Sequence, residues 1–133
     1  MPTHFLNPAG LAPTNGWTQV VTSTGGKTIY VSGQVSVDER GQAVGKGDLR
    51  AQTEQTFANL AVALKAAGAS FHDVVKMNLY VVGLKPEVVP LLRAVRARHV
   101  SRESPPASTL VGVTALVGAD WLIEIEAVAV VTG

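Results

Sequence analysis

The chain has 133 residues, of which 47% are apolar and 16% charged, with no cysteine and a formal net charge of +1. This length and apolar content predict a single globular domain over residues 1–133 with a true core, and they exclude a disordered chain. The absence of cysteine excludes disulfides, thiolate metal ligands and a cysteine nucleophile. The near-neutral charge argues against a protein built around nucleic acid, so we do not expect that partner.

No stretch of the chain approaches the roughly 18 uninterrupted apolar residues that a membrane-spanning helix needs. Residues 1–16 contain neither a basic segment nor a long apolar run, so we do not interpret them as a secretory signal. We therefore expect a cytoplasmic protein with no membrane partner.

Two β-rich runs come first, at residues 17–23 and 28–37. Gly25 and Gly26 lie between them and predict a hairpin turn, because glycine tolerates the positive φ that tight turns require. The second run alternates between two faces. One face carries Ile29, Val31, Gly33, Val35 and Val37, and the other carries Tyr30, Ser32, Gln34 and Ser36.

Two helices follow, each with a strand after it. Asp48 is a predicted N-cap for a helix that ends before Gly68, and a strand is expected over 73–82. Pro86 suits the first turn of a second helix, which Pro105-Pro106 would end. Two last strands are predicted at 107–116 and 121–131. The apolar stripes of the two helices are Leu49, Thr53, Phe57, Leu60, Leu64 and Ala67, then Val88, Leu91, Leu92, Val95 and His99.

This order predicts two helices packed on one face of a mixed sheet. The last run, LIEIEAVAVV, is largely apolar on both of its alternating faces. Because two helices can cover only one face of the sheet, we expect another copy of the chain to cover apolar residues on the other. The pattern therefore predicts a homo-oligomer.

Several segments together resemble the Rid family, the reactive intermediate deaminases, also called the YjgF family and historically L-PSP endoribonucleases. They are YVSGQV, AQTEQTFANLAVALKAAGAS, DVVKMNLYV and IEIEAVAV. The resemblance runs from about residue 17 to 131. It implies an α+β, chorismate mutase-like βαβ subunit with a mixed six-stranded sheet and two helices on one face. It also implies a barrel-cored homotrimer with three ligand clefts between subunits.

Active members of this family hydrolyse enamines and imines, such as 2-aminoacrylate, to a 2-keto acid and ammonia. The family's P-A-R-S motif supplies an arginine that holds the substrate carboxylate. The matching residues here are Pro106-Ala107-Ser108-Thr109, so Ser108 replaces the arginine and Leu110 replaces a frequent cysteine. A hydroxyl cannot replace a bidentate guanidinium. The loss of the guanidinium should weaken substrate binding and positioning by about two orders of magnitude.

Three more positions match the family's cleft. Trp17 replaces a frequent tyrosine, Gly33 of SGQ is retained, and Glu124 matches a glutamate that orients the hydrolytic water. The resemblance thus implies Glu124 as catalytic residue, with Trp17, Gly33, Ser108 and Leu110 binding the ligand. Glu126 lies on the same strand face as Glu124 but has no such match. We interpret it as part of a polar patch on a subunit interface.

Arg93, Arg96, Arg98 and Arg102 cluster on or just after the second helix. We interpret them as a solvated helix face; an RNA-binding stripe is the alternative, although the cluster lacks interleaved aromatic residues. A further hypothesis is that Arg102 reaches the cleft and replaces the missing cation. No metal site or cofactor is predicted, because the three histidines show no ligand spacing.

The leading hypothesis is a homotrimer whose clefts bind a small imine, enamine or carbonyl metabolite, with 2-aminoacrylate-type deamination disfavoured by Ser108. Two alternatives stay open. One is an active enamine or imine deaminase with a relocated cation such as Arg102. The other is a non-catalytic trimer that senses a ligand or binds another protein.

Overall fold

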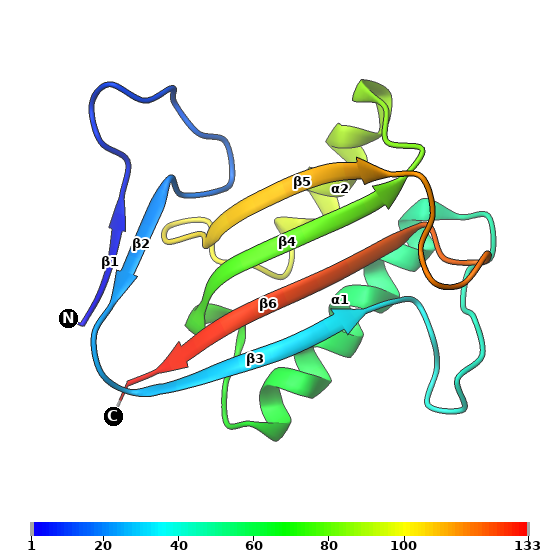
Figure 1. The fold of residues 1–133 in the computed structure, drawn as a ribbon, viewed down its shortest axis with the longest axis horizontal. Coiled ribbons are helices and arrows are strands. Elements are labelled where there is room, and N and C mark those ends of the chain that lie inside the picture. Colours follow the sequence, from blue (N-terminus) through cyan, green and yellow to red (C-terminus); the bar gives the residue numbers. More distant parts are fainter. Residues whose placement is uncertain (1, 133) are drawn as a thin grey trace.

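A computed structural model describes residues 2–132, which form an α+β fold with two α-helices and six strands (Figure 1). The helices are α1 (Leu49–Ala66) and α2 (Val89–Arg96), and short 3₁₀ turns precede β4 and α2 at Phe71–Asp73 and Pro86–Val88. The strands are β1 (Thr3–Leu6), β2 (Val20–Ser23), β3 (Lys27–Gln34), β4 (Val74–Val82), β5 (Ala107–Val113) and β6 (Ile123–Val131).

The main sheet has the strand order β3-β6-β4-β5, in which β4 and β5 are parallel and the other pairs antiparallel. Both helices lie behind this sheet in Figure 1. The predicted α+β class, the mixed sheet and the two helices on one face are therefore confirmed. The expectation of one six-stranded sheet is wrong, because β1 and β2 form a separate two-stranded sheet.

The predicted hairpin across Gly25 and Gly26 is also wrong. β2 pairs with β1, a strand that the sequence patterns did not predict, and β3 pairs with β6. Gly25 and Gly26 adopt φ values of 73° and 79°, and the carbonyl of Val131 lies against Gly26. The two glycines therefore carry the chain from the small sheet into the large one, beside the end of β6.

Helix α1 begins and ends where the sequence predicts. The Asp48 side chain accepts a hydrogen bond of 3.0 Å from the Ala51 amide, and Gly68 adopts a φ of 81° just beyond the helix. The predicted stripe faces the core: Thr53, Phe57, Leu60 and Leu64 are fully buried.

Helix α2 is shorter than expected and ends at Arg96, well before Pro105. The amides of Arg98 and His99 bond to the carbonyls three residues earlier, so the helix closes in a tight final turn. His99, expected on the helix face, lies in this turn. Its ring stacks on Phe57 with a centroid distance of 4.9 Å, and it also packs against Phe71.

The pH dependence of stability should report on His99. Burial and the nearby Arg98 lower the pKa of His99, although its Nε2 lies 3.0 Å from a Glu54 oxygen. The unfolded chain therefore takes up a proton near pH 6.5 that the folded chain accepts only at lower pH. We expect the free energy of unfolding to fall as the pH drops from about 6.5 toward the lowered pKa.

Urea unfolding at several values between pH 7.5 and 5.5 would measure this loss, with His99→Phe as the comparison. That variant keeps a ring between Phe57 and Phe71 but has no proton to exchange, so its pH profile should be flatter than that of the wild type. Parallel profiles for the two proteins would contradict the assignment.

Strand β3 does not keep the predicted alternation to its end. The register of its pairing with β6 shifts between Val31 and Gln34, a β-bulge that reverses which residues face the core. Ser36, predicted on the polar face, is fully buried, and its hydroxyl donates to the Val44 carbonyl at 2.7 Å.

The second face of the main sheet carries no helix. Tyr30 on β3 is 80% exposed and Val111 on β5 is 40% exposed, while Val128 and Val130 on β6 are half-buried. That another copy of the chain covers this face stays a prediction. Within residues 2–132, neither helix is long and apolar enough to cross a membrane.

Candidate functional site

Two adjoining cavities lie between α2, the start of β5 and the loop around Gly16. Their volumes are about 610 Å³ and about 210 Å³, and they share Arg93 and Arg96 of α2 in their walls. Trp17, Ser108 and Leu110 line the smaller cavity. The structure thus brings three of the residues selected from the sequence into one hollow.

Thr18 holds the loop with Trp17 beside β5. Its amide donates to the Pro106 carbonyl at 3.1 Å, and its buried hydroxyl donates to the Pro105 carbonyl. Thr18 also pairs with Ala107 in a single parallel bridge. These contacts hold Trp17, the residue before Thr18, beside the start of β5 and in the wall of the smaller cavity.

Ser108 and Leu110 lie on the helix-facing side of β5. Leu110 packs against the buried core cluster, and Ser108, two residues earlier, shares that face. The Ser108 hydroxyl oxygen is buried and has no hydrogen-bond partner among the described residues. An unsatisfied hydroxyl inside a cavity is a group that a ligand can engage.

Gly33 and Glu124 lie together, but on the opposite face of the sheet. In β6 the core-facing residues are Ile123 and Ile125, so Glu124 between them points away from the helices. The Glu124 carboxylate lies directly over Gly33, where a methyl group would overlap it. Glycine at position 33 is therefore required by this close approach, and its φ is not in the left-handed region.

The two neighbouring glutamates differ in their contacts. Glu126 accepts a hydrogen bond of 2.9 Å from the Tyr80 hydroxyl, and this bond is the main cause of the raised pKa of Tyr80. Among residues 2–132, the Glu124 carboxylate has no hydrogen bond or ion pair. Glu124 is therefore free to bind water or a ligand, whereas Glu126 is already engaged.

The candidate residues thus form two groups within one chain. Gly33 and Glu124 lie on the open face of the sheet, and Trp17, Ser108 and Leu110 lie on its helix side. The sheet itself separates the groups, so no ligand of one chain can touch both. A joint site requires a second copy of the chain.

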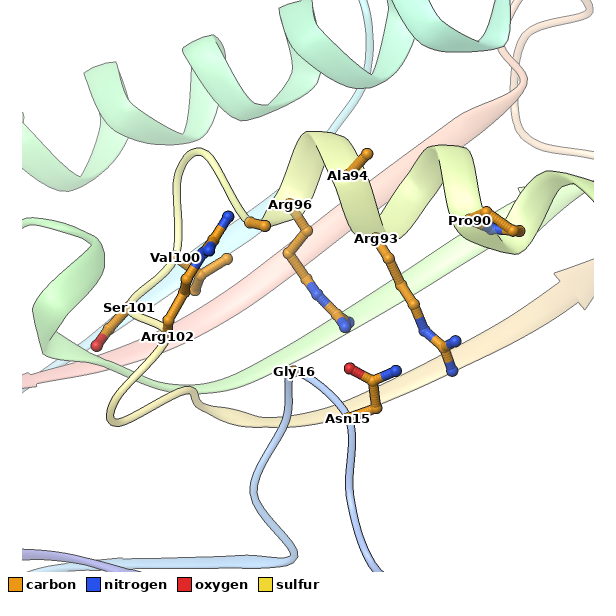
Figure 2. A pocket seen from close by; sticks show the side chains of 10 residues that line it. Asn15, Gly16, Pro90, Arg93, Ala94, Arg96, Val100, Ser101 and Arg102 are labelled. Atoms are coloured by element: carbon orange, nitrogen blue, oxygen red, sulfur yellow. The ribbon is translucent and has the colours of Figure 1, made fainter.

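Arg102 lines only the larger cavity and is exposed. In Figure 2, Arg93 and Arg96 extend from α2 toward the loop at Asn15 and Gly16, whereas Arg102 extends away from that loop. Arg96 and Arg93, and not Arg102, share the smaller cavity with Ser108.

The sequence patterns placed Arg96 on a solvated helix face, which is wrong because the side chain is only 9% exposed. A signal was present in the spacing. Arg96 follows Leu92 by four residues, so both share the buried face of the helix. Burial, and then the neighbouring Arg93, lower the pKa of Arg96.

The described residues were also considered as ligands for a metal ion. Across residues 2–132, no group of three or more histidine and acidic side chains could hold a metal ion.

The family follows from a comparison with known proteins. Residues 8–131 match the family model described as endoribonuclease L-PSP. The chain also superimposes on a crystal structure of YyfB from Yersinia pestis, described as a protein of unknown function of the conserved Rid protein family. That match has a TM-score of 0.88 and 35% identity over 98% of this chain and 100% of that one. The chain therefore belongs to the Rid, or endoribonuclease L-PSP, family.

Two curated relatives indicate the range of the family. A RutC family protein of Pyrococcus horikoshii is 36% identical over 78% of this chain and 79% of its own length. A protein of Dermatophagoides farinae named 2-iminobutanoate/2-iminopropanoate deaminase is 30% identical over 95% of this chain and 91% of its own length.

Proposed function

We propose that this protein is a cytoplasmic homotrimer that hydrolyses small imines and enamines in clefts between its subunits. One chain would contribute Gly33 and Glu124 to each cleft, and its neighbour would contribute Trp17, Ser108 and Leu110. The observation that carries the proposal is the free Glu124 carboxylate, held over Gly33 beside a glutamate that is already bonded to Tyr80. A relative named as an iminobutanoate and iminopropanoate deaminase supports the same chemistry.

The reaction needs little from the protein beyond positioning. An enamine first takes a proton on carbon and becomes an imine. Glu124 would accept a proton from a bound water as the water oxygen attacks the imine carbon, and the C=N electron pair would move to nitrogen, which takes up the proton that Glu124 releases. The hydroxyl proton of the resulting carbinolamine would then pass to nitrogen as the C–N bond breaks, so that ammonia leaves and the carbonyl forms. One water is consumed, and one carbonyl compound and one ammonia are produced.

Glu124 lies on the face of the main sheet that no helix covers, so a site built on it would need a second chain. On a single chain, Glu124 faces solvent-accessible sheet surface, where water exchanges freely. Coverage by a second chain would enclose the carboxylate and order the water that it holds. Val128 and Val130, half-buried apolar residues further along the same face of β6, support an interface on this face of the sheet.

The test is the release of ammonia and keto acid from freshly generated 2-aminoacrylate. Glu124→Gln should lower the rate about 100-fold, because an amide cannot accept the proton from water. Glu126→Gln is the matched control, since it changes a glutamate on the same face of the same strand. It should keep most of the activity.

Two results would overturn the proposal. Equal rates for Glu124→Gln and the wild type would remove Glu124 from the chemistry. A wild type that does not accelerate hydrolysis at all would favour the non-catalytic alternative, for which the replacement of the family arginine by Ser108 is the supporting observation.

A further inference from the structure

We propose that Arg96, assisted by Arg93, is the receptor for the carboxylate of a short-chain 2-oxo or 2-imino acid in the smaller cavity. The guanidinium would come from helix α2 and would replace the one that strand β5 lacks at Ser108. This inference rests on the proposed function, because it states how the same cleft holds its substrate.

The first support is a largely enclosed arginine without an acidic partner. Arg96 is only 9% exposed, yet no acidic side chain among residues 2–132 forms an ion pair with it, and its guanidinium donates no hydrogen bond there. The ion pairs that do exist involve Lys46, Arg98 and His99. The guanidinium lines both cavities and is largely withdrawn from bulk solvent, so an anion entering from outside the chain would find an unpaired cation there.

The second support is the local charge. Arg93 lines both cavities with Arg96, and no aspartate or glutamate contributes to either wall. Two cations in a partly enclosed, low-dielectric hollow create a positive potential that attracts small anions. Burial and Arg93 together make the charged state of Arg96 less favourable, as its lowered pKa indicates, and a bound carboxylate would relieve both effects.

The third support is the shape and lining of the smaller cavity. Its volume is about 210 Å³, and Trp17, Leu79, Leu92 and Leu110 supply apolar walls. The one buried hydroxyl without a partner there is that of Ser108. A carboxylate on Arg96 would leave the adjacent oxo or imino group near Ser108 and a short alkyl chain against the apolar walls. This lining favours a short organic acid over inorganic phosphate, which has no apolar part.

The fourth support is the packing that aims Arg96. A methyl group on Gly16 would lie 2.9 Å from Nη2 of Arg96, so the guanidinium lies close against the backbone of this glycine. Gly16 precedes Trp17, and Thr18 fixes the same loop to Pro105 and Pro106. The loop therefore holds the guanidinium beside the indole and the start of β5, as Figure 2 shows for the approach of Arg96 to Gly16.

Titration calorimetry with pyruvate tests the inference on the intact protein without any turnover. Arg96→Gln should weaken pyruvate binding about 100-fold, and Arg96→Lys about 10-fold, because lysine keeps the charge but not the bidentate geometry. Arg102→Gln is the matched control, since that arginine lines only the larger cavity, and it should change affinity by about twofold or less. Circular dichroism establishes that each variant is folded.

A comparison of ligands on the wild type does not depend on any variant. Pyruvamide, which has the same shape without the charge, should bind about 100-fold more weakly than pyruvate. Inorganic phosphate should compete with pyruvate only weakly. Equal binding of pyruvate and pyruvamide, or stronger binding of phosphate than of pyruvate, would overturn the inference. A loss of affinity in Arg102→Gln but not in Arg96→Gln would transfer the role to Arg102.

The carboxylate receptor at Arg96 and the deaminase activity can be tested independently. Glu124→Gln should bind pyruvate with affinity near that of the wild type, because Glu124 holds water and not the carboxylate. If wild-type protein binds pyruvate through Arg96 but hydrolyses no imine, the receptor stands and the deaminase proposal falls. If it hydrolyses imines and Arg96→Gln binds pyruvate normally, the receptor falls and the deaminase proposal stands.

Discussion

Replacing Phe57 by alanine is expected to lower the free energy of unfolding by about 3–5 kcal/mol. The Phe57 side chain is fully buried at the centre of α1, where it joins the helix to the core cluster of the main sheet. Its ring also stacks on His99 and packs against Phe71 at 5.9 Å, so the substitution would leave a cavity between three elements.

Chemical denaturation would measure this loss, with Val62→Ala as the matched control. Val62 lies on the same helix but is 71% exposed, and alanine favours helix, so that variant should change stability by about 0.5 kcal/mol or less. Similar losses in the two variants would show that Phe57 does not anchor α1 as described.

Replacing Gln52 by leucine is expected to lower the free energy of unfolding by about 3 kcal/mol, because it would remove three part-buried hydrogen bonds to backbone groups. The Gln52 side chain is fully buried on α1. Its Nε2 donates to the carbonyls of Gly45 and Asp120 at 3.1 and 2.9 Å, and its Oε1 accepts from the Leu122 amide at 2.8 Å. The side chain thus ties two loops to the helix.

This substitution should also lower the proposed deaminase activity, because Leu122 leads into β6 two residues before Glu124. Gln42→Leu, at an exposed position, is the control and should leave both stability and activity near the wild-type values. A stable and fully active Gln52→Leu protein would contradict the role of these three hydrogen bonds.

Features of the fold that depend on neighbouring residues were predictable from the sequence. Helix α1 begins after Asp48 and ends before Gly68 as expected, because helix capping and left-handed turns depend on only a few neighbouring residues. Strand pairing was less predictable, since alternation tells which face is buried but not which strand lies alongside. The prediction of a hairpin across Gly25 was wrong for this reason. The bulge in β3 also reversed the burial expected for Ser36.

The candidate site was predictable in part. The resemblance to the Rid family selected Trp17, Ser108 and Leu110, which the structure places around one cavity, and Gly33 with Glu124, which it places together elsewhere. The buried guanidinium of Arg96 was missed, because a charged residue on a helix is exposed in most proteins. The four-residue spacing from Leu92 was the available signal, and the packing of α2 against the loop at Gly16 shows that this arginine is enclosed.

The separation of Glu124 from Ser108 and Arg96 by the thickness of the sheet has an evolutionary consequence. Substitutions on α2 or β5 can change the lining of the smaller cavity without altering the contacts that place Glu124 over Gly33. Under the proposed function, ligand recognition by α2 and β5 and water activation by Glu124 would therefore be able to change independently during evolution. A chain with serine at position 108 of β5 can in this way present a cation from helix α2 to the same cavity and keep its carboxylate on β6.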